Sequence, residues 1–229
     1  MIPTTTSQQK NERFIYHEYM IILSQLDDNM IKKNEKLVLE MYRRNIFLSA
    51  TIRGLSLTLK KHYSLVYMAV QELVKKQILT LKKVGKSAVC ELTLTPESIS
   101  ILSYLDEQEA LTRDIKGMKK ILGFEDFLDD IILVTGSYVM GKQTPRSDID
   151  VVAITKDNAF NKQKLFENLT SVMMPPVHAI VITQKDFTKM LLDTEANFGK
   201  EIYNKRLIYR NASRYYTLLK EAIANGFKN

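Results

Sequence analysis

Two buried strands, one ending in a glycine–serine turn and the next opening with two aspartates, constrain the fold of this chain most strongly. Residues 131–134 are continuously apolar and run into the Gly136-Ser137 pair. After ten intervening residues (138–147), Asp148 and Asp150 lead into the apolar residues 151–154. Because side chains alternate along a strand, Asp148 and Asp150 should point to one side while the residues between and after them enter the core. The sequence therefore predicts an acidic pair beside a small-residue turn.

Two neighbouring carboxylates repel each other and lose solvation unless a cation lies between them. Mg²⁺ accepts carboxylate oxygens and usually shares its coordination with substrate phosphates. We therefore expect Asp148 and Asp150 to hold a divalent metal. The Gly136-Ser137 turn offers a place for phosphates, because glycine allows close backbone approach and the hydroxyl and amides can donate hydrogen bonds. Lys142 and Arg146 add charge at the same rim, although solvated cations in a turn are the alternative interpretation.

This pattern resembles the signature of the nucleotidyltransferase domain of the DNA polymerase β superfamily, in particular the minimal nucleotidyltransferases. Gly136-Ser137, ten residues and then Asp148-Ile149-Asp150 match that signature without a gap. The resemblance implies an α+β domain over residues 125–229, a mixed sheet with flanking helices. It also implies transfer of a nucleoside monophosphate from an NTP, ATP being the first candidate, with Mg²⁺ or Mn²⁺. Asp148 and Asp150 would be catalytic metal ligands, and Gly136, Ser137, Lys142 and Arg146 would bind the nucleotide.

The strand predicted at residues 177–183 departs from that superfamily. The family usually places a third carboxylate there, whereas this strand has no Asp or Glu and holds His178 at the corresponding position. Imidazole can bind a metal, so His178 is a candidate third ligand, but it brings no negative charge. A packed, hydrogen-bonded histidine is the alternative. Two functions stay open: an enzyme with an unknown acceptor (a protein hydroxyl, a nucleic acid or a small molecule), or a regulator that binds nucleotide without catalysis.

The net charge of +7 comes entirely from residues 1–96, which hold 15 Lys/Arg and 8 Asp/Glu, whereas residues 97–229 hold 18 of each. This division predicts two modules, of which the first meets a polyanion, although a solvated lysine-rich surface would give the same balance. Helical periodicity at residues 35–44, from residue 51, and after the predicted N-cap Ser64 precedes two strand-like runs joined at Gly85. This order resembles a winged helix-turn-helix, which we place at residues 34–96.

In winged helices the second helix of the pair enters the DNA major groove, and the wing meets phosphates. By that resemblance Ser64, Tyr67 and Gln71 would face base edges. The phosphate backbone would meet the lysines Lys60, Lys61, Lys82, Lys83 and Lys86. The helix has no arginine and is partly apolar, so a protein partner or a dimer contact fits the same face. Double-stranded DNA is the expected partner.

Composition limits the remaining classes. A single cysteine, Cys90, excludes a disulfide framework and a multi-thiolate metal site within one chain, and we expect it in the core. No apolar run approaches the roughly 18 residues that span a bilayer, and the first ten residues lack the apolar part of a secretion signal. We expect a cytoplasmic protein with no membrane partner. Residues 1–33 are predicted to form a tail and a helix (11–26), and this helix is a candidate homodimer contact. Residues 97–124 are predicted to form a linker of two helices that divide near residue 106.

Overall fold

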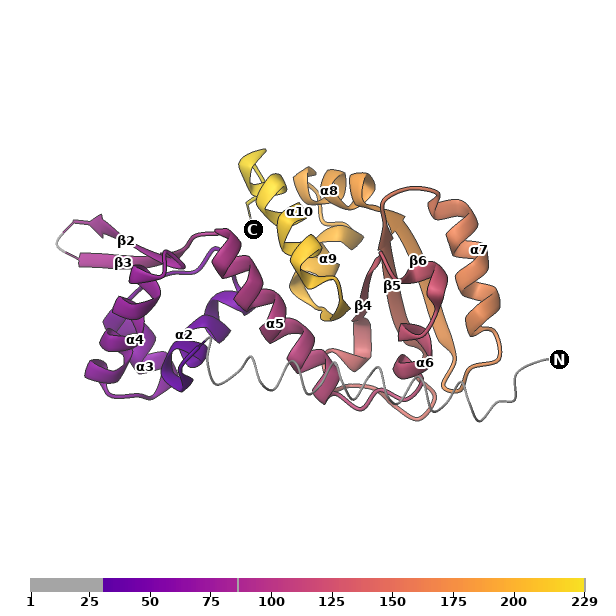
Figure 1. Cartoon of the computed structure of the whole chain (residues 1–229), viewed down its shortest axis with the longest axis horizontal. Helices are drawn as coiled ribbons and strands as arrows, with labels where there is room; N and C mark the ends of the chain where they lie inside the picture. Colours follow the sequence, from indigo (N-terminus) through magenta and orange to yellow (C-terminus); the bar gives the residue numbers. More distant parts are fainter. Residues whose placement is uncertain (1–30, 86, 229) are drawn as a thin grey trace.

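The computed structural model describes residues 31–85 and 87–228. The helix predicted at residues 11–26, and Lys86, lie outside these residues. Figure 1 shows two parts side by side, with the long helix α5 (Pro96–Thr112) running from one to the other. The N-terminal part carries a small sheet, and the C-terminal part carries a larger sheet with helices on both faces.

The N-terminal part follows the order helix, strand, helix, helix and hairpin in its described residues. Its elements are α2 (Lys33–Arg44), β1 (Ser49–Thr51), α3 (Ile52–Leu59), α4 (Tyr63–Lys75), β2 (Leu79–Val84) and β3 (Ser87–Leu92). Strand β3 pairs antiparallel with both β1 and β2, which gives the spatial order β1-β3-β2. Strand β1 could not be predicted, because three residues are too few to show an alternating pattern.

Helix α4 buries the stripe that its sequence predicts. The buried side chains are Val66, Ala69, Val70 and Leu73. They pack in a core that also holds Tyr42 and Cys90, both fully buried, and the Tyr42 hydroxyl donates to the Cys90 carbonyl at 3.0 Å. The prediction of Cys90 as a core residue is therefore confirmed. The prediction of Ser64 as an N-cap is wrong: α4 begins at Tyr63 after His62, which makes no side-chain cap.

The C-terminal part is built on a four-stranded mixed sheet with the order β6-β5-β4-β7. Strands β5 and β6 are parallel, whereas β4 is antiparallel to both of its neighbours. The elements after α5 are α6 (Met118–Leu122), η1 (Glu125–Phe127), β4 (Ile131–Thr135), η2 (Gly136–Tyr138), β5 (Ile149–Thr155), α7 (Ala159–Thr170), β6 (Val177–Thr183), α8 (Gln184–Leu192), α9 (Phe198–Asn204), β7 (Leu207–Arg210) and α10 (Ala212–Ala224). The expected α+β architecture with a mixed sheet and flanking helices is confirmed for this part of the chain.

The two faces of the sheet bury different cores, as the alternation of β5 requires. Ile149 and Val151 belong to the core that includes Phe166 of α7, whereas Val152 belongs to the core that includes Phe187 of α8. Figure 1 shows α7 on one side of the sheet and α8, α9 and α10 on the other. Among the described helices, none is long and apolar enough to cross a membrane.

Helix α5 is continuous through the position where two helices were predicted to divide, so that prediction is wrong. Its start is as predicted, because the Thr95 side chain accepts a hydrogen bond from the Ser98 amide at 3.2 Å. Farther along, Asp106 is only 4% exposed and is bound by Arg43 of α2 at 2.7 Å and by the Tyr216 hydroxyl at 2.6 Å. The acidic residues that look like a solvated break are therefore inside the molecule.

Candidate active site

The turn after β4 is shaped around an aspartate of the neighbouring strand. Gly136 has φ +72°, a conformation that L side chains rarely adopt. A Cβ atom on Gly136 would overlap Oδ2 of Asp150 and would lie 3.1 Å from its Cγ. The glycine therefore lets the backbone of the turn approach the carboxylate to a distance that no other residue allows.

Both predicted aspartates stand at the beginning of β5. Asp148 directly precedes the strand and is exposed, and Asp150 is its second residue, with 31% of its side chain exposed. In the ladder Asp150 lies opposite Thr135, the last residue of β4. The residues of the Gly-Ser, Asp-x-Asp pattern thus converge where β4 ends and β5 begins, at one edge of the sheet.

His178 completes a row across three strands. It is in parallel register with Asp150, and its Nδ1 lies 3.0 Å from Asp150 Oδ1. The His178 side chain is 63% exposed, so its ring can be reached from solvent. The strand β6 has the predicted bounds, and the position across from Asp150 holds an imidazole where a third carboxylate was the family expectation.

A contact that the sequence analysis missed fixes the other side of the turn. The Thr135 hydroxyl donates to the backbone carbonyl of Lys205 at 2.7 Å, which ties the end of β4 to the segment between α9 and β7. Thr135 is 3% exposed, so this buried hydroxyl is satisfied by that bond. The sequence signal was a polar residue between a continuous apolar strand and Gly136.

The loop that joins the turn to β5 carries the two predicted cations. The Lys142 amide donates to the Ser137 carbonyl at 3.0 Å, and the Tyr138 hydroxyl donates to the Ser147 carbonyl at 3.4 Å, so the loop folds back on the turn. Lys142 and Arg146 are both exposed, and neither side chain forms an ion pair within the described residues. Both are therefore available to an anion that approaches this edge.

The donor set fits a divalent metal that shares its ligands with a substrate. Over residues 31–85 and 87–228, no group of three or more His, Cys, Asp or Glu side chains gathers into a metal site. Mg²⁺ is commonly held by one or two carboxylates together with phosphate oxygens and water. Two aspartates at an exposed strand end, with Asp150 packed against a glycine turn, fit that mode rather than a complete protein cage.

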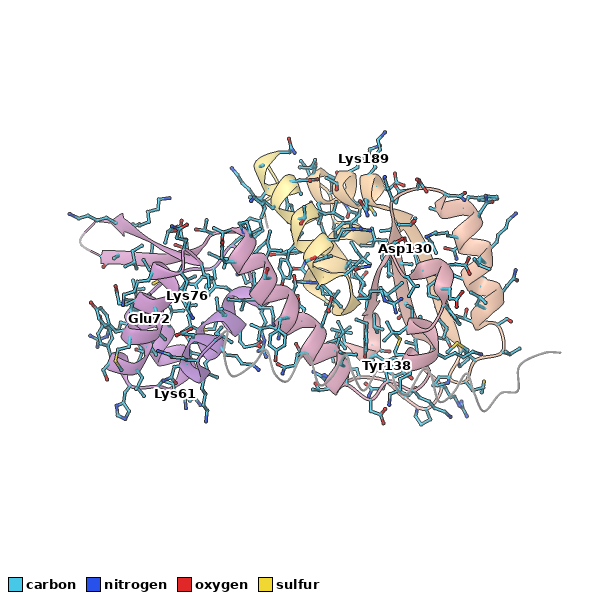
Figure 2. All side chains as sticks on the ribbon, in the orientation of Figure 1. Lys61, Glu72, Lys76, Asp130, Tyr138 and Lys189 are labelled. Atoms are coloured by element: carbon cyan, nitrogen blue, oxygen red, sulfur yellow. The ribbon has the colours of Figure 1, made fainter. Side chains whose placement is uncertain are left out.

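The residues predicted to meet DNA are spread over α4 and its surroundings. Lys60, Lys61, Ser64 and Tyr67 are exposed around the α3–α4 turn and the first half of α4, and Gln71 is half-buried. Figure 2 shows Lys61 at this turn and Glu72 farther along α4. The predicted cations of the hairpin, Lys82 and Lys83, are exposed on β2, and Lys86 lies outside the described residues.

The same surface also exposes apolar side chains. Four large ones stand out: Leu57, Tyr63, Tyr67 and Met68. The rings of Tyr63 and Tyr67 stack with their centroids 6.1 Å apart. This surface therefore combines lysines with an aromatic and aliphatic centre.

Comparison with protein families gives a match in the C-terminal part of the chain. Residues 104–209 match the family model of the nucleotidyltransferase domain. The matched segment runs from within α5 to β7 and includes Gly136, Ser137, Asp148, Asp150 and His178. The matched residues are therefore similar to nucleotidyltransferase domains. The match does not extend to the N-terminal part, and no curated protein and no solved structure matches the chain.

Proposed function

We propose that the chain is an enzyme that transfers a nucleoside monophosphate from an NTP to an acceptor hydroxyl and releases pyrophosphate. The observation that carries the proposal is the fit of Gly136 against Asp150, because it joins the two halves of the signature in one site. The family match of residues 104–209 supports transfer chemistry of this class.

Each side chain has a role in the proposed site. Asp148 and Asp150 would hold Mg²⁺ or Mn²⁺, with His178 as a candidate third ligand. A bound divalent metal supplies charge neutralisation for the triphosphate. The amides and the hydroxyl of the Gly136-Ser137 turn bind the terminal phosphates. Lys142 and Arg146 stabilise negative charge that develops on the leaving pyrophosphate.

The transfer step itself is an in-line displacement. The acceptor oxygen forms a bond to the α-phosphorus, and the bond from that phosphorus to the α,β-bridging oxygen breaks, so that its electron pair leaves with pyrophosphate. If His178 is not a metal ligand, the proton of the acceptor hydroxyl passes to its free ring nitrogen, and Asp150 at 3.0 Å stabilises the imidazolium. ATP is the nucleotide we propose first, and the acceptor is a protein hydroxyl, a nucleic acid or a small molecule.

A second candidate function is nucleotide sensing without transfer, which is favoured by the imidazole opposite Asp150. The test incubates the full chain with α-labelled NTPs and Mg²⁺ or Mn²⁺, and compares it with the double variant Asp148→Ala, Asp150→Ala. Label on any acceptor with the wild type alone supports the enzyme. Metal-dependent NTP binding without transfer to acceptors of the three classes supports the sensor, and absence of both refutes the site.

We propose that the N-terminal part is a winged helix-turn-helix that binds double-stranded DNA. The order α2-β1-α3-α4-β2-β3 and the sheet order β1-β3-β2 support it, as does the exposure of the lysines around α4 and on β2. The variant Lys82→Ala, Lys83→Ala, Lys86→Ala should bind duplex DNA more weakly and with a shallower salt dependence. A matched variant replaces three exposed lysines of the C-terminal part, Lys185, Lys189 and Lys220, and should bind as the wild type does.

The apolar centre of α4 supports the alternative of a protein partner on the same surface. Substitution of Tyr67 and Met68 by serine should leave a phosphate-dominated DNA complex with the same salt slope. If the lysine variant and the serine variant both bind duplex DNA as the wild type does, the DNA proposal is wrong. The α4 surface is then assigned to a protein.

A further inference from the structure

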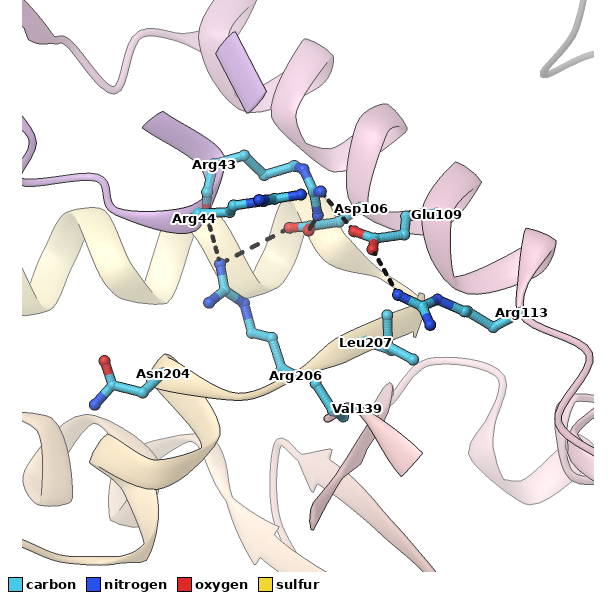
Figure 3. Close-up of a pocket in the computed structure, with 9 residues that line it drawn as sticks. All are labelled: Arg43, Arg44, Asp106, Glu109, Arg113, Val139, Asn204, Arg206 and Leu207. Carbon is cyan, nitrogen blue, oxygen red and sulfur yellow. Dashed lines mark hydrogen bonds and ion pairs between the residues drawn. The ribbon is translucent and has the colours of Figure 1, made fainter. Parts of the chain in front are cut away.

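A cavity of about 250 Å³ lies where the two parts of the chain meet, outside the site described above. Four arginines line it, as Figure 3 shows: Arg43 and Arg44 at the end of α2, Arg113 just after α5, and Arg206 just before β7. Val139, which follows the turn at Gly136, forms part of the wall. The cavity therefore touches the N-terminal part, α5 and the nucleotidyltransferase domain at once.

The two carboxylates in the lining are already committed to Arg43. Its guanidinium lies 2.7 Å from Asp106 and 2.5 Å from Glu109, and it also binds Glu40 at 2.6 Å. Burial alone would lower the pKa of Arg43, but Asp106 and Glu40 outweigh burial and raise it above its ordinary value. Arg43 is therefore charged. The cavity is lined by four arginines and two carboxylates, so its lining is net positive, and Glu40 beside Arg43 reduces the excess to one positive charge.

Arg206 is the most deeply buried of the other three arginines. Its side chain is 6% exposed, and its terminal nitrogens reach the Tyr203 carbonyl, the Arg43 carbonyl at 3.5 Å and Asp106 at 3.9 Å. Its Nε has no hydrogen-bond partner among the described residues. This Nε is shielded as well as unpaired, so the group that Arg206 can offer to an oxyanion is the terminal nitrogen whose two contacts, at 3.5 Å and 3.9 Å, are long.

The mouth of the cavity adds two more cations. Arg44 is exposed and forms no ion pair within the described residues, and the Arg113 side chain, 48% exposed, has a single long contact of 3.4 Å to Glu109. A single water needs about 10–15 Å³ of such space, so the cavity has room for a larger polar group. A polar cavity with a net positive lining, and with Arg44 at its mouth without an ion pair among the described residues, favours an anion with several oxygens.

We infer that this junction cavity binds a phosphate group, through Arg206 at its floor and Arg44 and Arg113 at its mouth. Bound phosphate would contact residues of both parts of the chain, so it would stabilise their relative placement. By linkage, binding to the folded state raises the free energy of unfolding. The inference does not depend on the proposed transfer reaction, because it requires neither a metal nor turnover.

The test uses the full chain in EDTA, which removes the metal, at constant ionic strength. Inorganic phosphate and pyrophosphate are titrated by isothermal calorimetry, with the melting temperature as a second readout. We expect saturable binding and a rise in melting temperature. The variant Arg44→Gln, Arg113→Gln should weaken the affinity at least tenfold, and its two exposed positions allow the chain to fold.

Two matched variants remove the same charge elsewhere. Lys116→Gln with Lys120→Gln removes two exposed cations away from the cavity, and Lys142→Gln with Arg146→Gln removes the two at the Gly-Ser turn. Both should retain phosphate binding in EDTA. Loss of binding in the Lys142/Arg146 variant alone would place the phosphate at the turn and overturn the inference. Equal loss in every variant, absence of saturable binding, or displacement by acetate at the same concentration would overturn it as well.

Discussion

Replacing Gly136 with alanine tests the candidate site with a single methyl group. The residue has φ +72°, and the added Cβ would overlap the Oδ2 atom of Asp150. The backbone can stay in place only if the Asp150 carboxylate turns away, which also disturbs its 3.0 Å contact with His178. The substitution therefore acts on the position of the carboxylate more than on the core.

The expected losses differ for stability and for activity. A left-handed conformation costs an L residue roughly 1–2 kcal/mol, which for a chain of this length corresponds to a fall in melting temperature of about 2–8 °C. The Asp150 carboxylate must move by about 1 Å, and a displacement of that size can lower a rate by about 100-fold. We therefore expect a chain that folds but loses about two orders of magnitude in kcat/KM.

Gly141 provides the matched control in the same loop. It has φ +65°, close to that of Gly136, but a Cβ there meets nothing within 4 Å. Gly141→Ala should therefore lose a similar amount of stability and keep its activity. The difference between the two variants isolates the contact with Asp150 from the cost of the backbone conformation.

The assay measures label transfer from α-labelled NTP, and metal-dependent NTP binding by calorimetry where no acceptor is found. Melting temperatures of both variants are recorded alongside. If Gly136→Ala keeps activity and NTP binding within threefold of Gly141→Ala, the carboxylate does not need its observed position. The reasoning that joins the two halves of the signature would then be refuted.

Three further predictions follow from other contacts. Asp106→Asn should lower the free energy of unfolding in urea by about 3–5 kcal/mol, because the buried charge of Arg206 then lacks the negative charge of its carboxylate partner. Glu109→Gln, at a partly exposed site, should lower it by less. Mg²⁺ should bind weakly without nucleotide and strongly with it in calorimetry, since the described residues offer no site of three or more ligands; strong binding to the free chain would contradict this. Burial raises the pKa of Cys90 to about 11 from 9.0. The contribution of this thiol to stability is therefore complete below pH 9 and is lost as the pH rises toward 11, by up to about 1.4 kcal/mol per pH unit. Cys90→Ala should remove that part of the alkaline loss, which is measured as urea midpoints at pH 8 and pH 10.5.

The sequence predicted the centre of the C-terminal part because its signals are local. Continuous apolar runs, small residues at the turn and alternation after Asp148 all lie within a short segment, and β6 has the bounds that its residues indicate. The roles of Asp148 and Asp150 remain predictions, but the structure brings Asp150 against Gly136 and His178.

The parts that could not be predicted depend on partners far away in the sequence. Asp106 looks like a solvated helix end, and only the fold supplies Arg43 and Tyr216, which are 63 and 110 residues away. Arg206 is similar, since nothing in its own segment indicates that it is almost fully buried. Short elements fail for another reason: β1 has three residues, too few for any periodicity to show.

The buried charges at the junction bear on how the two parts act together. Replacing a buried ion pair with apolar residues is often neutral for stability, so such pairs are weak evidence of stabilisation. Here the pairs join α2 to α5, and the same cluster reaches Arg206 beside β7. Because Asp106 contacts Arg43, Arg206 and Tyr216, a change in the placement of α2 would leave a buried charge without compensation. The cluster therefore favours one placement of the N-terminal part over others.

The imidazole at position 178 changes the charge balance of the candidate site in a definite direction. Two carboxylates neutralise one divalent metal, and a third would favour metal binding before the substrate arrives. With His178 in that place the protein supplies one negative charge fewer, so oxygens of the triphosphate must complete the coordination. His178→Asp should therefore let Mg²⁺ bind the free chain, measured by calorimetry without nucleotide, whereas His178→Asn, similar in size but uncharged, should not. If neither variant differs from the wild type, His178 lies outside the metal's reach and acts only as a hydrogen-bond partner of Asp150.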